Sequence, residues 1–417
     1  MKGSHALGID IGTSGVRVAL LGSDQRPIGQ ASKSMSDYGD NRRSPASWFA
    51  TLDAVLSDLA AQHDLSKVGA VSVDGTSGTV VALDASGAPV GDALMYNDAV
   101  DDPSIPEQIG KAAPRESAAH GPASALARTM VLQQRSGVER IVHQADWIAE
   151  QLAGAPVPTD ESNALKTGYD PVARQWPDWF GSISLNTDLL PSVLPCGTRS
   201  GELSGAFGLP KGVPLVAGVT DGCASFLATG ASEPGDGVTA LGTTLTLKLL
   251  SEQPVFAPEY GIYSHRIGDM WLAGGASNTG GGVLAAHFEP QDLDGLSKRI
   301  DPDRPTGLDY YPLTKPGERF PTADPSLAPR LEPRPDDDAI FLQALFEGIA
   351  RIERTGYDRL FELGAPALKS VRTVGGGAGN PVWRAIRENT LEIKQSPSLS
   401  EDAAVGSARL AHKWLQQ

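Results

Sequence analysis

The apolar and polar positions at the start of the chain alternate as they do in a half-buried β-strand. Residues 7–11 follow this period of two, and residues 16–20 resume it after a short interruption. The interruption, 12–15, contains two glycines and two hydroxyl-bearing residues, which is typical of a tight turn. The pattern predicts a hairpin whose tip exposes backbone N–H groups and hydroxyls, with the carboxylate of Asp10 just behind the tip.

Similar patterns predict the elements of the remaining chain. Apolar alternation or short apolar runs predict further strands at 27–35, 68–73, 79–83, 215–219, 238–250 (a second strand–turn–strand unit) and 371–374. Helical spacing of apolar residues predicts helices at 47–59, 124–134, 139–152, 223–228, 338–363, 383–391 and 401–414. We interpret 159–179 as irregular structure lining a cleft, and the Pro-rich stretch 302–335 as a surface excursion or lid.

The order of these elements repeats. Each half has a Gly-Thr hairpin, then a helix, then an apolar strand that ends in a Gly-rich turn, at 74–78 and at 375–379. A chain of 417 residues is also too long for one core. We therefore predict an α/β protein of two domains, 1–212 and 213–417, around a central cleft. Such a duplication would place two phosphate-binding turns face to face across the cleft, where a nucleotide and a small substrate meet.

Composition restricts the partners. The net charge is 35 − 50 = −15, which argues against nucleic acid or an anionic membrane surface as a partner. No apolar run approaches the roughly 20 residues of a membrane span, and no signal-peptide pattern opens the chain. Only two cysteines are present, which indicates a reducing cytoplasm and no disulfides. We expect a cytoplasmic monomer or homodimer.

Several common catalytic motifs are missing from the sequence. There is no Gly-x-x-x-x-Gly-Lys-Ser/Thr phosphate loop and no Gly-x-Ser-x-Gly elbow, and the seven histidines lack metal-ligand spacing. What remains are three carboxylates, each at the end of an apolar strand next to glycine: Asp10, Asp74 and Asp221.

Asp221 is the candidate general base, because a carboxylate held at a strand end can accept the proton of a sugar hydroxyl that attacks phosphorus. The alternative is that Asp221 only caps the helix that follows it. For Asp74 we expect a local role, capping its own turn and leaving Ser77 and the turn's backbone facing the cleft.

The glycine-rich turns suit a nucleotide. Exposed N–H groups and hydroxyls at the first hairpin suit a phosphate, and Asp10 beside them suits the accompanying Mg²⁺. The turn at 242–244 has the same character, and Trp383 follows a Gly-rich turn, where it could stack on a purine. Each feature also has an ordinary explanation: a plain hairpin turn in the first two cases, a core tryptophan in the third.

Several short motifs, taken in order, resemble the FGGY family of carbohydrate kinases over nearly the whole chain. The matching segments are Asp10-Ile11-Gly12-Thr13, Asp74-Gly75-Thr76-Ser77-Gly78, Gly218-Val219-Thr220-Asp221-Gly222, Leu241-Gly242-Thr243-Thr244 and Gly375-Gly376-Gly377-Ala378-Gly379-Asn380. The resemblance implies two ribonuclease-H-like (actin-like ATPase) domains, ATP, Mg²⁺ and closure of the cleft.

Within the family the chain looks most like the short D-ribulose kinases of the cyanobacterial and plant type. The segments that carry this closer match are Ser72-Val73-Asp74-Gly75-Thr76-Ser77-Gly78-Thr79, Tyr263-Ser264-His265, Gly274-Gly275-Ala276-Ser277-Asn278, Gly307-Leu308-Asp309-Tyr310-Tyr311-Pro312 and Gly317-Glu318-Arg319-Phe320-Pro321. The chain also departs from the glycerol and xylulose kinases: it is shorter, and Tyr96-Asn97-Asp98 stands where those enzymes have a Trp-x-Asp-x-Arg sugar-binding run.

The resemblance implies roles for individual residues. Asp221 would be the base, and Asp10 with Thr13 would hold the metal and the transferring phosphate. The residues expected at the sugar are Asp10, Ser14, Gly15, Ser77, Asp221 and Glu332. Those expected at the nucleotide are Thr13, Gly242, Thr243, Gly376, Gly377, Asn380 and Trp383.

The function we predict is therefore ATP-dependent phosphorylation of a ketopentose, D-ribulose to D-ribulose 5-phosphate. One alternative is a xylulokinase or another polyol kinase. The other is an actin- or chaperone-like ATPase that transfers no phosphate to sugar. The position of Asp221 before the second Gly-Thr hairpin, and the lack of an evident peptide-binding domain, favour the kinase.

Overall fold

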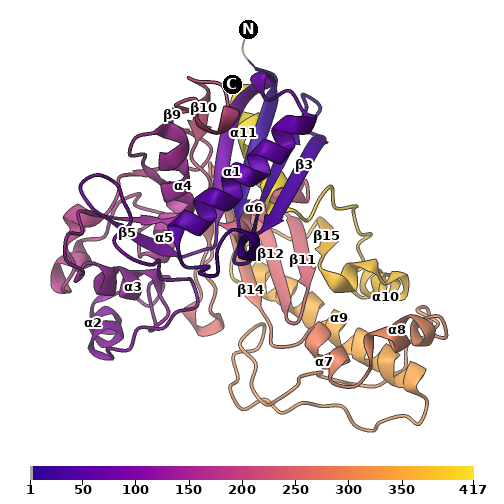
Figure 1. Ribbon diagram of the computed structural model, residues 1–417. Coiled ribbons are helices and arrows are strands. Elements are labelled where there is room, and N and C mark those ends of the chain that lie inside the picture. Colours follow the sequence, from indigo (N-terminus) through magenta and orange to yellow (C-terminus); the bar gives the residue numbers. More distant parts are fainter. Residues whose placement is uncertain (1–2) are drawn as a thin grey trace. The chain divides into compact units, whose positions relative to one another are not determined.

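The computed structural model describes residues 3–417, which form two compact units. The first unit is the chain up to Ala228 together with His265–Gly268 and Asp402–Gln417. The second unit is Thr229–Ser264 together with Asp269–Glu401. Figure 1 labels many of the helices and strands of both units.

The first unit is built on a six-stranded sheet with the order β3-β2-β1-β4-β10-β9. Its strands are β1 (His5–Ile11), β2 (Gly15–Leu21), β3 (Pro27–Ser34), β4 (Val68–Gly75), β9 (Arg199–Glu202) and β10 (Pro214–Val216). The predicted first hairpin is confirmed: β1 runs antiparallel to β2 and, on its other side, parallel to β4.

The remaining strands of the first unit are short: β5 (Val80–Leu83), β6 (Arg140–His143), β7 (Thr159–Asp160), β8 (Val193–Leu194) and β13 (His265–Ile267). Its helices are α1 (Pro45–Gln62), α2 (Ser104–Ala112), α3 (Ala125–Leu132), α4 (Gln144–Ala153), α5 (Glu161–Lys166), α6 (Asp221–Ala228) and α11 (Ala403–Leu415).

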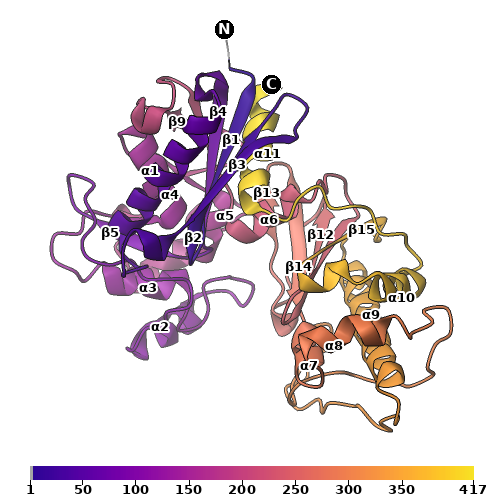
Figure 2. The ribbon, with the colours of Figure 1, turned by 45° about the vertical axis from the view of Figure 1, so that its right-hand side comes forward.

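Helices cover both faces of this sheet. Apolar residues of α1 and α4 share one core with the inward-facing side chains of β1, β2 and β4. On the other face α11 packs against β1 and α6, as Figure 2 shows. The approach of α11 is so close that a Cβ at Gly8 would lie 1.9 Å from the carbonyl oxygen of Ala404. Asp10 lies two residues beyond Gly8 and therefore points to the same face.

The second unit has a sheet with the order β14-β12-β11-β15. Its strands are β11 (Asp236–Leu241), β12 (Leu245–Ser251), β14 (Met270–Ala276) and β15 (Ser370–Val374), and its helices are α7 (Gly281–Ala285), α8 (Pro290–Ser297), α9 (Asp338–Glu362) and α10 (Pro381–Leu391). The long helix α9 packs against β12 and β14 and, with α10, encloses the core of this unit.

The predicted repeat is present in the topology. In the first unit β1 lies between its hairpin partner β2 and the parallel strand β4. In the second unit β11 lies in the same way between its hairpin partner β12 and the parallel strand β15. Each unit thus places a hairpin turn and the end of a parallel strand at one edge of its sheet.

The units divide the chain differently from the two predicted ranges. Residues 213–228 belong to the first unit, because β10 pairs in parallel with β4. Residues 402–417 join it as well, because α11 packs on β1. No helix in residues 3–417 is long and apolar enough to cross a membrane.

Two local predictions were wrong, and a third needs a correction. The stretch 139–152 is not one helix, because Arg140–His143 pairs with Val80–Leu83 before α4 begins. The stretch 159–179 is not wholly irregular, since Asp160 caps the short helix α5. The stretch 302–335, predicted as a surface excursion or lid, has no helix or strand but is not entirely at the surface, because it buries Tyr310, Leu313, Glu318 and Phe320.

Candidate active site

Three carboxylates meet in the first unit. Asp10 on β1 is the direct parallel-strand partner of Asp74 on β4, and Asp221 is the first residue of α6. Asp10 and Asp74 are buried, and the charge of Asp221 acts on both of them. Burial raises the pKa of Asp10, although hydrogen bonds with Asp74 and Arg17 oppose the shift. Burial and the charge of Asp10 raise the pKa of Asp74 well above its usual range.

Arg17 is the cation of this cluster. Its Nη1 donates to Asp10 Oδ2 over 2.9 Å, and its side chain is 47% exposed. The hairpin register aligns the two residues directly across β1 and β2. Counting outward from the turn at 12–15 in the sequence pairs Arg17 with Asp10 in the same way.

Asp74 does not cap its own turn as predicted. Its Oδ2 accepts a hydrogen bond from Ser407 Oγ on α11, at 2.5 Å. Its Oδ1 is buried, and no described residue donates a hydrogen bond to it. Because ionised carboxylates only accept hydrogen bonds, Asp74 can donate to Asp10 only when Asp74 carries a proton. The turn is capped by Gln144 instead, whose Oε1 accepts from Thr76 N at 2.9 Å and from Thr76 Oγ1 at 2.7 Å.

Ser77 lies in that turn, at the end of β4. Its Oγ is buried and has no hydrogen-bond partner in the described part of the chain. The same is true of Nε2 of Gln144, which contacts the turn through its other amide atom. Buried polar atoms normally have partners, so unsatisfied atoms beside a carboxylate cluster favour a site that receives a polar ligand or water.

The segment that carries Asp221 is hydrogen-bonded to a buried serine, Ser162. Ser162 Oγ on α5 accepts from Thr220 N at 3.3 Å and lies 3.3 Å from Thr220 Oγ1. It also lies 3.0 Å from His265 Nδ1. Asp221 itself begins α6 and its Oδ1 accepts from Gly222 N at 2.7 Å. The local contact with Gly222 shows that the carboxylate supports its own turn, in keeping with the capping alternative, and it does not exclude the role of a base.

The tip of the first hairpin carries the other predicted residues of this unit. Gly12 N donates to Gly15 O at 2.9 Å, which closes the turn and leaves Thr13 and Ser14 exposed. Ser14 O accepts from Met35 N at 2.9 Å, so the tip is tied to the segment after β3. Thr13, Ser14 and Gly15 are thus placed next to Asp10 by the hairpin, as the sequence pattern predicts.

The second unit contains a pocket of about 690 Å³. Its floor is formed by two turns at the ends of neighbouring strands: Gly242 and Thr243 between β11 and β12, and Gly376 and Gly377 after β15. Gly375 has a φ of +87°, a conformation that L side chains rarely adopt, and this bend starts the second turn. The walls are largely apolar and come from α7, α8 and α10.

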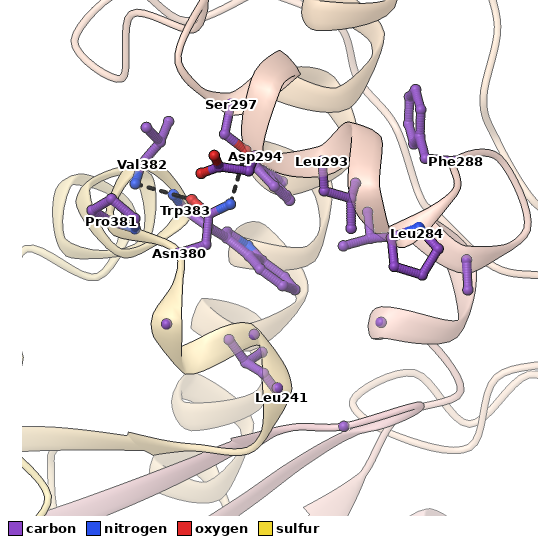
Figure 3. A pocket seen from close by; sticks show the side chains of 18 of the residues that line it. Leu241, Leu284, Phe288, Leu293, Asp294, Ser297, Asn380, Pro381, Val382 and Trp383 are labelled. Carbon is purple, nitrogen blue, oxygen red and sulfur yellow. Dashed lines mark hydrogen bonds between the residues drawn. The ribbon is translucent and has the colours of Figure 1, made fainter.

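Figure 3 shows how Asn380 and Trp383 lie in this pocket. Asn380 Oδ1 accepts from Val382 N and Trp383 N, both at 3.0 Å, and so caps α10. Its Nδ2 donates to Ser297 Oγ on α8 at 2.8 Å and fixes the separation of the two walls. Trp383 is only 2% exposed and stacks on Phe346, with ring centroids 4.7 Å apart and an angle of 11° between the planes.

The observed packing of Trp383 matches the alternative of a core tryptophan on one face of its ring. Its remaining surface lines the pocket, and its Nε1 is buried without a partner among the described residues. Glu332, the last predicted site residue, lies in the second unit and is exposed. Its Oε2 accepts from Arg334 N at 3.1 Å. A role for Glu332 at the sugar stays a prediction.

Sequence reasoning did not find the supporting residues Gln144, Ser162 and Ser407. Each lies on a helix distant in sequence from the carboxylate or turn that it contacts. No local motif marks them, since the contacts depend on which helices the sheet brings to its edge.

Comparison with known proteins identifies the class to which this arrangement belongs. A solved structure of a xylulose kinase from Rhodospirillum rubrum superimposes with a TM-score of 0.81 at 22% identity, over 98% of this chain and 89% of the other. The fold is therefore that of the proteins with two ribonuclease-H-like domains, the actin-like ATPase class, as predicted.

The family follows from sequence. The model of the N-terminal domain of FGGY carbohydrate kinases matches residues 5–103, and that of the C-terminal domain matches residues 237–413. The two matches together span more than half of the chain, which belongs to the FGGY family of carbohydrate kinases.

Individual relatives differ in their named sugar. The chain is 27% identical over 433 residues to a xylulose kinase of Streptomyces coelicolor, covering 98% of this chain and 88% of the relative. It is 22% identical over 454 residues to a gluconokinase of Bacillus subtilis, covering 98% and 87%. The family and the class of enzyme, a carbohydrate kinase, are thus established.

Proposed function

We propose that this carbohydrate kinase uses Mg-ATP to phosphorylate a ketopentose, and that D-ribulose becomes D-ribulose 5-phosphate. The observation that carries the proposal is the grouping of three carboxylates and an unsatisfied serine hydroxyl at one sheet edge of the first unit. Hydroxyls of a sugar are the ligands that such a set of acceptors and donors would bind.

The pocket of the second unit supports the nucleotide role. A volume of about 690 Å³ lies in the range of small-molecule and cofactor sites. Its largely apolar walls suit a purine, and its two glycine-rich turns suit phosphates, which backbone N–H groups bind without a cationic side chain. The strongly acidic composition of the chain agrees with phosphate binding of this kind.

For Asp221 we propose the role of general base. A carboxylate accepts the proton of the attacking sugar hydroxyl as the oxygen bonds to phosphorus, and the nucleoside diphosphate leaves. The support from Ser162 through Thr220 fixes the backbone from which Asp221 extends. A fixed backbone keeps the base in a productive orientation, which is a large part of phosphoryl-transfer catalysis.

The carboxylate cluster also fits a divalent cation. No group of three or more His, Cys, Asp or Glu in residues 3–417 could hold a metal alone. Mg²⁺ in kinases, however, takes one or two carboxylates and completes its shell with phosphate oxygens and water. Asp10 would hold the ion, which supplies charge neutralisation at the transferred phosphate. The charge of Asp221 acts on both Asp10 and Asp74, and a cation at this edge would offset that repulsion.

The choice of sugar is supported by the segment around Asp98. Both carboxylate oxygens of Asp98 are bonded to Arg43, and Met95 N donates to Oδ2 at 2.8 Å. These contacts lower the pKa of Asp98 and use its acceptors. The chain also has no Trp-x-Asp-x-Arg run here, so the contacts typical of glycerol and xylulose kinases are not reproduced by Asp98. This difference and the motifs shared with the short D-ribulose kinases both favour D-ribulose as the substrate.

D-xylulose is the second candidate, because xylulose kinases of several bacteria are among the relatives. The test is a panel of D-ribulose, D-xylulose, glycerol and gluconate with detection of released ADP. We expect the highest kcat/KM with D-ribulose. A clear preference for D-xylulose would overturn the choice of sugar, and ATP turnover independent of every sugar would favour the ATPase alternative.

A further inference from the structure

The segment Gly317–Pro321 belongs to the stretch interpreted as a lid, yet it carries a buried carboxylate. Glu318 is 3% exposed. Its Oε1 accepts from Asn278 N at 2.8 Å and Arg319 N at 2.9 Å, and its Oε2 accepts from Ser277 Oγ at 2.5 Å and Tyr311 OH at 3.1 Å. A carboxylate with four N–H and O–H donors is firmly held and holds its donors in turn.

Two of those donors belong to the turn that follows β14. Thr279 N donates to Ser277 Oγ at 3.1 Å, and Asn278 Nδ2 donates to Gly317 O at 2.9 Å. Thr279 Oγ1 donates to Pro312 O at 2.5 Å. The turn is therefore hydrogen-bonded at Ser277 and Asn278 to the segment that contains Glu318, and at Thr279 to Pro312.

The same turn lies against the hairpin that carries Gly242 and Thr243. Gly281 N donates to Gly242 O at 2.8 Å, and Gly282 N donates to Thr243 O at 2.9 Å. Leu245 N donates to Thr279 O at 2.7 Å on the far side of the hairpin tip. Gly242, Thr243, Gly281 and Gly282 all line the pocket proposed to bind the nucleotide.

We propose that Glu318 is a positioning residue for the phosphate-binding part of this pocket. Glu318 fixes residues 277–279, these residues fix Gly281 and Gly282 against the hairpin, and the hairpin thereby keeps its N–H groups directed at the phosphates. The inference rests on the proposed nucleotide site. It assigns a function to the Gly317–Pro321 segment that is not that of a lid, and it needs no contact between Glu318 and the nucleotide.

The geometry distinguishes two substitutions. In Glu318→Gln the carbonyl oxygen can replace Oε1, and the amide group can donate to Ser277 Oγ and Tyr311 OH, because a hydroxyl accepts as readily as it donates. In Glu318→Ala all four hydrogen bonds are lost, and the buried Ser277 hydroxyl loses its acceptor. We therefore expect the glutamine variant to keep most of the positioning and the alanine variant to lose it.

Glu347 on α9 provides a matched control. It is 8% exposed, and it likewise accepts from a backbone N–H and a hydroxyl, those of Thr306, at 3.0 and 2.6 Å. Its hydrogen bonds come from Thr306 and Gln343, not from the turn after β14. Glu347→Ala removes a buried carboxylate of the same unit without removing any hydrogen bond between Glu318 and the turn after β14.

The experiment measures the Kd of Mg-ATP by calorimetry without sugar, the KM values of ATP and D-ribulose, and the melting temperature. For Glu318→Ala we expect Kd and KM of ATP to rise about tenfold, with KM of the sugar unchanged. Glu318→Gln should stay within about threefold of the wild type. Glu347→Ala should bind ATP like the wild type, even if its melting temperature falls as much as that of Glu318→Ala.

Wild-type ATP affinity in Glu318→Ala would overturn the proposal. An equal loss of ATP affinity in Glu347→Ala, or an ATP affinity in Glu318→Gln as low as in Glu318→Ala, would overturn it as well. If Glu318→Ala does not fold, Ser277→Ala and Tyr311→Phe each remove one hydrogen-bond donor to Glu318. Unchanged ATP affinity in both variants would contradict the positioning role of Glu318. A wild type that binds ATP but phosphorylates no sugar contradicts the proposed function alone, because the binding series still tests Glu318.

Discussion

The buried ion pair between Glu353 on α9 and Arg387 on α10 gives the sharpest test of how the nucleotide pocket is supported. The two side chains are 0% and 1% exposed and form two hydrogen bonds, of 2.6 and 2.7 Å. Thr239 on β11 donates to Glu353 Oε1 at 2.5 Å, and Arg387 Nη1 donates to Thr373 Oγ1 on β15 at 2.8 Å. The pair thus joins α9 and α10 to the neighbouring strands β11 and β15.

Replacing Arg387 with methionine leaves Glu353 buried with only hydroxyl partners. Removing one partner of a buried pair costs about 3–5 kcal/mol of unfolding free energy, because the remaining charge is uncompensated. Replacing both residues with methionine removes both charges, and we expect this double variant to recover most of the loss. The comparison isolates the uncompensated charge from the loss of packing volume.

Urea unfolding followed by circular dichroism measures both variants. With a slope of about 2 kcal/mol/M, the single variant should lower the midpoint of the second unit by about 2 M. Since α10 begins at the pocket wall, Mg-ATP affinity should fall with it. A loss below about 1 kcal/mol in the single variant, or a double variant no more stable than the single one, would refute the reasoning.

Two further predictions concern the first unit. Burial and the charge of Asp10 raise the pKa of Asp74, so the stability that this group contributes is full below its unfolded pKa of about 3.9 and is lost as pH rises toward the folded pKa. Asp74→Asn, which is always neutral and can still accept from Ser407, should therefore unfold at a higher temperature than the wild type at pH 8, and this difference should shrink toward pH 4; a constant difference would contradict the assignment. Ser162→Ala removes the acceptor of Thr220 N and should lower kcat about tenfold with little change in the sugar KM, and steady-state kinetics showing only a raised KM would exclude a positioning role.

The sequence predicted the elements whose pattern is local. The hairpins at the starts of both sheets follow from alternation interrupted by glycine. Asp10 and Asp221 were found because each stands next to glycine at the end of an apolar run, although Asp221 begins α6 in the structure. The first half of 139–152 was missed because Ile141 and Val142 suit either period, and pairing with β5 decided the outcome. Helix α5 was missed because its polar residues are buried, which removes the amphipathic pattern.

The site residues that sequence reasoning could not reach depend on tertiary contacts. Ser407 reaches Asp74 across 333 positions, and Glu318 reaches Ser277 across 41. Such partners are set by which helix or loop the sheet edge brings close, and no spacing rule encodes them. Trp383 shows the converse: its place after a Gly-rich turn was informative, while its stacking on Phe346 could be seen only in the structure.

The most direct test of sugar phosphorylation with Asp221 as base compares ADP release by the wild type and by Asp221→Asn, with and without D-ribulose. We expect ADP release by the wild type to depend on D-ribulose and to yield a sugar product that carries the phosphate. In the variant, kcat should fall by about 100-fold or more while Mg-ATP still binds, since only the base is removed. Full sugar-dependent ATP consumption by Asp221→Asn would contradict the role of Asp221 as the base. Wild-type ATP turnover unaffected by any sugar would contradict sugar phosphorylation.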